Sequence, residues 1–150
     1  MPTTPAAVLP ALRLPNWPEL LGAYLTAQLA QPFAWGQNDC CLFAAGAVQA
    51  ITGIDLASHL RGQYSTAAEA ARILADEGGL VALASANFGA PRSNPGQAQR
   101  GDVVCVEVDG RQMLGVVAGA QWCAPGPNGL VYRPLAEVTD PGAPALVWEV

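Results

Sequence analysis

Apolar residues in the first half of the chain recur at the three- and four-residue spacing that is typical of helices. This spacing predicts a first helix over residues 16–30 and a second over residues 40–52. Asn38 or Asp39 can cap the start of the second helix, because either side chain accepts a hydrogen bond from a free backbone N–H. Gly53 is expected to end it, since glycine adopts the left-handed conformation that commonly follows a helix.

Two further helical segments are expected after this helix. Residues 56–61 can form a short helical turn. Thr66 and Glu69 have the spacing of a capping box, so a helix should begin there and run to Glu77. The glycine pair at 78–79 should then end it.

From about residue 87 the pattern changes to a loop followed by short β-rich runs separated by turn residues. Two strands are expected over residues 102–108 and 111–119, because the Asp109-Gly110 pair between them favours the tight turn of a hairpin. Further short strands are expected over residues 120–123, 129–135 and 145–150.

Helices followed by antiparallel strands predict an α+β fold, in which N-terminal helices pack on a C-terminal antiparallel β-sheet. We expect this single domain to span residues 16–150. Residues 1–15 are rich in proline and are expected to form an extended arm that can lie along a neighbouring protein.

Composition and charge narrow the possible partners. Hydrophobic residues make up 51% of the chain, which is ample for a core and excludes disorder of the domain. The net charge of −5 and the absence of lysine argue against nucleic acid or an anionic membrane as a partner. No signal peptide or membrane-spanning stretch is recognised, and the low charged fraction of 13% indicates a surface that is covered in an assembly.

Four cysteines are candidates for chemistry, and two of them, Cys40 and Cys41, are adjacent at a predicted helix start. A thiol there lies at the positive end of the helix dipole, as a nucleophilic cysteine needs, but this signal alone favours two small apolar residues that begin a buried helix. The dipole alone offers about 0.3–1 kcal/mol, so we expect Cys40 to stay mostly a thiol at neutral pH. No C-x-x-C pair occurs, so a structural zinc site is not expected. Cys40, Cys41, Cys105 and Cys123 could hold an iron–sulfur cluster if the fold brought them together, but adjacent ligands are awkward for one cluster, so neither a metal nor a cofactor is expected. Because no secretion signal is recognised, the thiols are expected to be reduced.

Four short segments carry a resemblance to a known family. They are PFAWG, DCCLFAA at a helix start, RGDVVCV at a strand start and MLGVVAG on the next strand. In this order they resemble PYxWGG, DCSGLV, PGDLVFF and HVGIYLG of the NlpC-type cysteine peptidases, which have a papain-like fold and cleave peptide bonds in peptidoglycan. The paired cysteines and the RGxY pattern of residues 61–64 are most similar to small, degenerate NlpC-like proteins encoded among phage tail genes.

The resemblance assigns site positions residue by residue. Cys40 occupies the position of the family's nucleophile, and Phe33 that of the tyrosine that assists at the oxyanion site. The family's catalytic histidine falls on Met113, and the chain's single histidine, His59, is expected on the surface. A working cysteine hydrolase needs a base beside the thiol, so Cys40 is interpreted as a vestigial nucleophile.

The resemblance, together with the missing base, implies a structural or interaction component of a phage tail tip or baseplate, made in the host cytoplasm and located in the virion. Its partners would be other tail or baseplate proteins. Two alternatives stay open: a peptidoglycan endopeptidase or amidase that uses Cys40 with an unidentified base, and a cell-wall binding module that grips peptidoglycan without cutting it.

Overall fold

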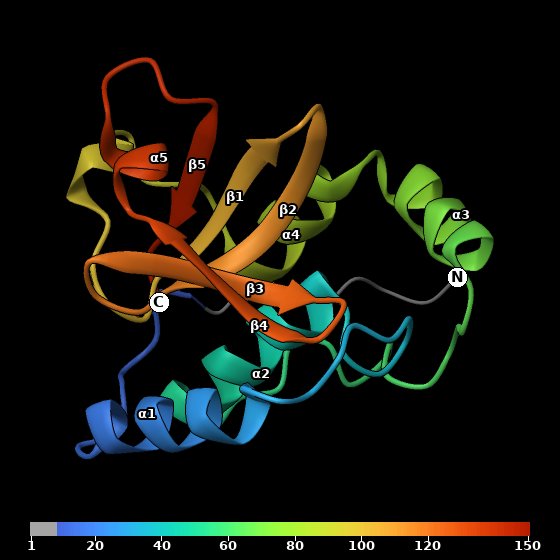
Figure 1. The fold of residues 1–150 in the computed structure, drawn as a ribbon, viewed down its shortest axis with the longest axis horizontal. Coiled ribbons are helices and arrows are strands. Elements are labelled where there is room, and N and C mark those ends of the chain that lie inside the picture. The colour runs from blue at the N-terminus through green and yellow to red at the C-terminus, as the bar shows by residue number, and fades with distance from the viewer. Residues whose placement is uncertain (1–8) are drawn as a thin grey trace.

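The computed structural model describes residues 9–150 (Figure 1). The helices and strands, in chain order, are α1 (Trp17–Gln28), α2 (Cys40–Thr52), α3 (Ala67–Glu77), α4 (Leu80–Phe88), a short 3₁₀ helix (Pro95–Gln97), β1 (Val103–Val108), β2 (Arg111–Val117), β3 (Gln121–Gly126), β4 (Gly129–Pro134), α5 (Ala136–Thr139) and β5 (Ala145–Trp148).

The strands form one antiparallel sheet in the order β4-β3-β2-β1-β5. The predicted α+β class, with N-terminal helices and a C-terminal antiparallel sheet, is therefore confirmed. The hairpin of β1 and β2 has the predicted turn: Asp109 and Gly110 both have positive φ, 51° and 77°, and Val108 pairs with Arg111.

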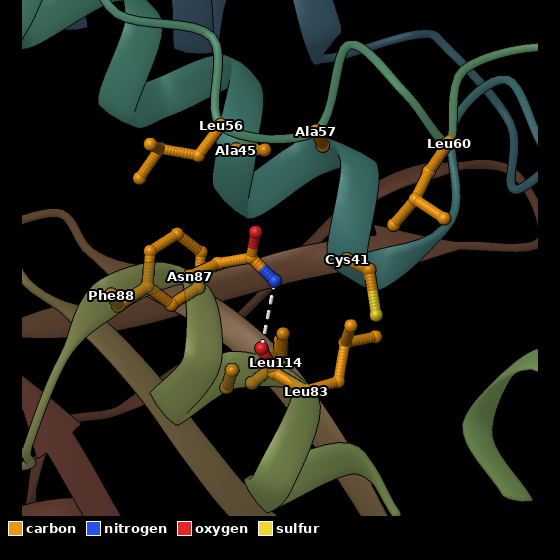
Figure 2. A pocket seen from close by; sticks show the side chains of 10 residues that line it. Cys41, Ala45, Leu56, Ala57, Leu60, Leu83, Asn87, Phe88 and Leu114 are labelled. Carbon is orange, nitrogen blue, oxygen red and sulfur yellow. Dashed lines mark hydrogen bonds between the residues drawn. The ribbon is translucent and has the colours of Figure 1, made fainter. Parts of the chain in front are cut away.

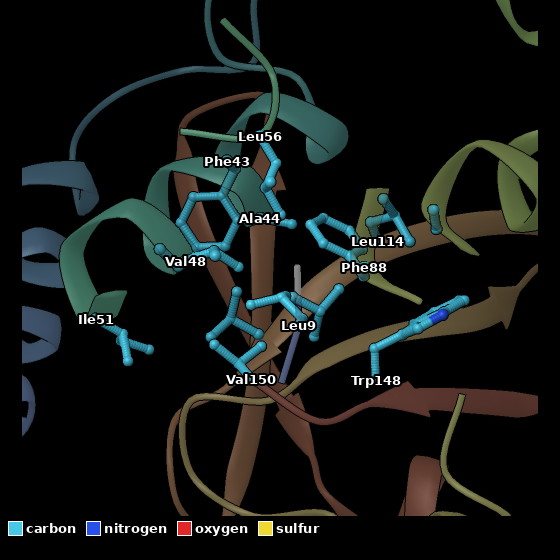
Figure 3. Close-up of a cluster of buried hydrophobic side chains, with 14 of the residues drawn as sticks. Leu9, Phe43, Ala44, Val48, Ile51, Leu56, Phe88, Leu114, Trp148 and Val150 are labelled. Carbon is cyan, nitrogen blue, oxygen red and sulfur yellow. The ribbon is translucent and has the colours of Figure 1, made fainter. Parts of the chain in front are cut away.

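The alternation of side chains along each strand gives the sheet two covered faces. One face, which includes Leu114 and Val116 of β2, packs with residues of α1, α2 and α4 in the main core (Figure 3). The other face, which includes Met113 and Trp122, forms a second cluster with Val138 of α5. Neighbouring residues of β2 therefore lie on opposite sides of the sheet.

Capping residues and glycines set the ends of α2 and α3 where the sequence predicted them. Asp39 caps α2 by accepting from the Leu42 N–H, and Gly53 follows the helix with φ of 82°. The capping box of Thr66 and Glu69 forms at the start of α3 as well. At α1, Asn16 occupies the N-cap position, but its side chain makes no capping bond.

Three segments differ from the prediction. Residues 80–88 form α4, which the sequence analysis had missed because the glycine pair before it was interpreted only as a stop. Residues 136–139 form the short helix α5, also missed. Residues 56–61 form hydrogen-bonded turns instead of the expected helical turn. The N–H groups of Leu60 and Arg61 both donate to the Ala57 carbonyl in these turns.

The predicted N-terminal arm is described only from residue 9, and residues 1–8 lie outside the described part of the chain. Residues 9–14 contain no helix or strand. Leu9 is only 9% exposed and belongs to the main core cluster (Figure 3). This part of the arm therefore packs on its own domain, where we had expected it to lie along a neighbour.

Arg13 ties the arm to distant parts of the fold. Its Nε donates to the carbonyl of Val150 at 2.8 Å, and its Nη1 donates to the carbonyl of Arg100 at 2.9 Å. Its Nη2 lies 3.5 Å from a carboxylate oxygen of the fully buried Asp102. The arm, the start of β1 and the C-terminal residue are held together at this point.

Candidate functional site

The start of α2 places Cys40 and Cys41 beside the sheet, where they pack against the main core. Asp39, which is 2% exposed, has extended backbone angles, and its Oδ1 accepts from the Leu42 N–H at 3.0 Å. This bond satisfies one of the free N–H groups at the helix start and fixes where the helix begins. The two cysteines that follow are half-buried.

The same carboxylate also joins two distant segments of the chain. Oδ2 of Asp39 accepts from the Gly36 N–H at 3.0 Å and from the Tyr64 hydroxyl. Gly62 in turn donates its N–H to the Gly36 carbonyl at 2.9 Å. The WG segment and the RGxY segment, which the sequence analysis noted only through the resemblance, thus meet at the helix start that carries the cysteines.

Gly36 is required by this contact. Its φ is 74°, and a Cβ at this position would lie 1.8 Å from the Tyr64 carbonyl oxygen. Only glycine combines the left-handed conformation with this close approach of two backbone segments.

Arg61 secures the other side of the RGxY segment. Its guanidinium forms two hydrogen bonds with Asp55, at 3.0 and 3.2 Å, and lies 3.5 Å from the Leu42 carbonyl. The ion pair is partly exposed, so its role is to hold the turn in place rather than to add much stability.

The four thiols have different electrostatic environments. A hydrogen bond from the Cys41 thiol and another from the Leu114 backbone N–H lower the pKa of Cys40, and they outweigh the opposing effect of burial. The pKa of Cys41 is raised by the same thiol–thiol bond and by burial. Burial raises the pKa of Cys105 to about 11 and that of Cys123 to about 12. Of the four thiols, only Cys40 has a lowered pKa, and the sequence analysis did not foresee the hydrogen bonds that lower it.

A cavity of about 120 Å³ opens beside the paired thiols. Its polar lining consists of the two cysteines with Asp39, Tyr64 and Gln112. Aromatic and aliphatic side chains complete the lining: Trp35, Leu60, Ala70, Ile73, Leu74, Leu80 and Leu83. Gln112 was not singled out by the sequence analysis, although the two-residue alternation of β2 puts it on the same sheet face as Leu114.

Met113 and Phe33 are not brought together with Cys40. Met113 packs in the cluster on the opposite sheet face, and Leu114 is the residue of β2 that contacts the cysteines' side of the sheet. Phe33 is half-buried outside the cavity lining, with its ring at 86° to that of Trp35 and 4.6 Å between ring centroids. Of the three predicted positions, only Cys40 lies at the candidate site.

No unengaged proton acceptor of residues 9–150 lines this cavity. Asp39 is occupied by three donors, and His59 is exposed on the 56–61 turn. Glu107, on the same sheet face, lines a neighbouring depression beside Val81 and Pro144, which shares Gln112 with this cavity, but Glu107 itself is not part of the cavity lining. The site thus contains a thiol with a lowered pKa, and no side chain of the described cavity lining is free to take up a proton from it.

Within the described residues, no three His, Cys, Asp or Glu side chains converge so that they could hold a metal ion. No helix in that part of the chain is long and apolar enough to cross a membrane.

The chain belongs to a family described as a domain of unknown function (DUF6950), whose model matches residues 12–141. No curated protein and no solved structure matches the chain.

The alkylation of Cys40 should report the thiol–thiol hydrogen bond. We expect iodoacetamide to modify Cys40 first, with a half-maximal rate at a pH below the ordinary thiol value of about 8.5. Removing the donor in Cys41→Ala should move this profile to higher pH, because the thiolate loses one of its stabilising bonds. Mass spectrometry of the alkylated peptides across a pH series measures both.

Cys123→Ala is the matched control, since this buried thiol hydrogen-bonds to the Val116 carbonyl and not to Cys40. An unchanged profile in Cys41→Ala would show that the thiol–thiol bond does not set the pKa of Cys40.

Proposed function

We propose that this protein is a structural or interaction subunit of a phage tail tip or baseplate, built on a degenerate NlpC-like, papain-like fold without catalytic activity. The observation that carries the proposal is the set of side chains around Cys40. The strand beside this thiol places Leu114 on the side of the sheet that faces α2, and no free acid–base group lines the cavity.

The chemistry of thiol hydrolases explains why this matters. A positioned general base or acid contributes roughly 10²–10⁴ in rate, and a cysteine nucleophile acts together with such a partner. Neither Leu114 nor Met113 carries a group that can take up or deliver a proton. A lowered pKa makes Cys40 a better nucleophile but leaves no group to protonate an amine leaving group.

The arrangement around Cys40 supports the NlpC-like part of the proposal. The thiol follows Asp39 at the start of a helix, and that helix packs against the central strand of an antiparallel sheet. The resembling segments also lie on the elements that the resemblance implies: DCCLFAA at the start of α2, RGDVVCV at the start of β1, and MLGVVAG on β2, the next strand.

The exposed surface supports an interaction role. Leu29, Trp35 and Val131 are large apolar side chains that remain exposed. Backbone bonds from Leu130 to Leu29 and from Phe33 to Gly126 hold their segments side by side. Exposed apolar patches of this kind usually mark surfaces that a partner covers.

The test is incubation of the purified protein with purified peptidoglycan, followed by mass spectrometry of soluble muropeptides. We expect no release from the wild-type protein or from Cys40→Ser. Release by the wild type that is lost in Cys40→Ser would overturn the proposal. Co-sedimentation with peptidoglycan in the same samples would reveal a binding module, and mass spectrometry of purified particles should detect the subunit itself.

One observation favours a second candidate, a peptidoglycan endopeptidase or amidase that uses Cys40. The pKa of this thiol is lowered by hydrogen bonds, as in activated cysteine nucleophiles. Such an enzyme would need a base from another subunit, and the same muropeptide assay with assembled particles would detect it.

A further inference from the structure

The cavity of about 120 Å³ beside the paired thiols is lined mainly by apolar side chains. Those that close it on the side of the helices include Leu60 of the 56–61 turn, Ala70 and Ile73 of α3, and Leu80 and Leu83 of α4. An apolar cavity of about 150 Å³ is known to hold benzene, so this one can accommodate an apolar chain of up to about six carbons.

A smaller pocket shares part of this lining and is not part of the site. Cys41, Leu60 and Leu83 line both spaces. The smaller pocket measures about 20 Å³, and Figure 2 shows the side-chain oxygen of Asn87 in it, an atom that no donor of residues 9–150 reaches. That volume holds about one water molecule, so an apolar chain is confined to the larger cavity.

Cys40 places a reactive sulfur on the wall of the larger cavity. The Cys41 thiol and the backbone N–H groups of Leu114 and Cys41 hydrogen-bond to this sulfur and lower the pKa of Cys40. The thiolate is the form of cysteine that acts as a nucleophile. The environments of the other three thiols raise their pKa values, so those thiols stay protonated.

The missing base restricts the reactions that this thiol can complete. Cleavage of an amide needs a proton for the departing amine, and no free acid–base group of the described residues lines the cavity to deliver it. A thioester has no such requirement. Its leaving group is a thiolate, which departs without a proton because the ordinary pKa of a thiol is only about 8.5.

We propose that Cys40 is an acylation site, which takes up a short acyl group from a small-molecule acyl thioester and holds the acyl chain in the cavity bounded by α3, α4 and the 56–61 turn. The Cys40 sulfur attacks the carbonyl carbon of the donor and forms a new C–S bond, while the C–S bond of the donor breaks. The electron pair of that bond leaves on the donor's sulfur. Water accepts the proton that Cys40 releases and supplies the one that the departing thiolate takes up.

The acyl group is expected to remain on Cys40. Rapid hydrolysis of a thioester requires a water molecule that a base activates, and no free base of the described residues lines the cavity. The reaction is therefore a stoichiometric modification without turnover. It depends neither on cleavage of peptidoglycan nor on incorporation into a particle.

Acylation is tested with the N-acetylcysteamine thioesters of hexanoic and acetic acid, followed by mass spectrometry of the intact protein and fragmentation of its peptides. We expect one hexanoyl group on Cys40, which neutral hydroxylamine removes because the linkage is a thioester. Cys40→Ala should stay unmodified. Cys123→Ala is the matched control and should react like the wild type, because Cys123 is buried and hydrogen-bonds to the Val116 carbonyl.

The apolar cavity predicts a preference for the longer chain. We expect hexanoyl transfer to the wild type to be at least about tenfold faster than acetyl transfer, because the longer chain buries more apolar surface. Ala70→Leu fills part of the cavity and should slow hexanoyl transfer toward the acetyl rate. Ala71→Leu, at the exposed neighbouring position of α3, is the matched control and should keep the preference.

Four results would overturn the proposal. They are no hexanoyl adduct on the wild type, an adduct that persists in Cys40→Ala, equal rates with the two donors, and an unchanged preference in a folded Ala70→Leu variant. The comparison of the two donors uses the wild type alone and does not require any variant to fold. Rapid loss of the acyl group to water would also overturn the proposal, and it would favour the hydrolase candidate.

Discussion

Replacing Gly36 by alanine is expected to destabilise the domain by about 3–5 kcal/mol, far more than the same change at Gly62. Both glycines have left-handed backbone angles, with φ of 74° and 72°. This conformation alone costs an alanine about 1–2 kcal/mol. The two positions differ in the space that a new Cβ would enter.

At Gly36 that space is occupied by the Tyr64 carbonyl, 1.8 Å from the added Cβ, whereas nothing lies within 4 Å of a Cβ at Gly62. Because the obstacle is backbone, Gly36→Ala must displace the RGxY segment and with it the Tyr64 bond to Asp39. Gly62→Ala can keep every one of these contacts.

Urea unfolding monitored by circular dichroism measures the free energy of unfolding of both variants, and Gly62→Ala serves as the matched control. Equal destabilisation of the two variants would show that the approach of Tyr64 to Gly36 is not tight. The reactivity of Cys41 provides a functional readout, because loosening the Asp39 contacts should expose this thiol to iodoacetamide.

The parts of the fold that the sequence predicted are those with local end signals. Asp39 and Gly53 bound α2, and Thr66, Glu69 and Gly78 bound α3, because each signal is a bond or backbone conformation within a few residues of the helix. The Asp109-Gly110 turn likewise fixes the register of its hairpin.

α4 could not be predicted from the same kind of pattern. Residues 80–88 are apolar or small on every side, with only Ser85 and Asn87 as polar residues, so no amphipathic contrast marks a helix. The helix is stabilised instead by burial against the main core through Leu80, Ala84 and Phe88. Tertiary packing of this kind is not visible in local spacing.

The candidate site was predictable only at Cys40. The alternation of β2 indicates that Leu114 and Met113 face opposite ways, but not which of them faces α2. The bond from Tyr64 to Asp39 joins residues 25 positions apart, and no periodicity relates them. The orphaned oxygen of Asn87 follows from packing alone.

The last expected result concerns the arm, where the same substitution at two leucines should change the stability of the fold by very different amounts. Leu9→Ala removes a side chain that is 9% exposed and belongs to the main core, so we expect a loss of about 2–3 kcal/mol. Leu12→Ala changes a side chain that is 94% exposed and should alter stability by less than about 0.5 kcal/mol. Thermal unfolding of the two variants measures this difference, and an unchanged stability in Leu9→Ala would show that the arm does not pack on the domain in solution.

If the protein is a tail subunit, as proposed, Leu12 is an exposed large apolar side chain of the described arm and remains available to a neighbour. Leu12→Ala should then lower the number of copies in purified particles while leaving the melting temperature unchanged, because an apolar side chain that is exposed in the monomer contributes only where a partner covers it. Quantitative mass spectrometry of particles carrying each variant makes the comparison. Normal incorporation of Leu12→Ala would remove the exposed leucine of the arm from the docking surface, and the other exposed apolar side chains, among them Leu29, Trp35 and Val131, would remain as candidates for contact with a partner.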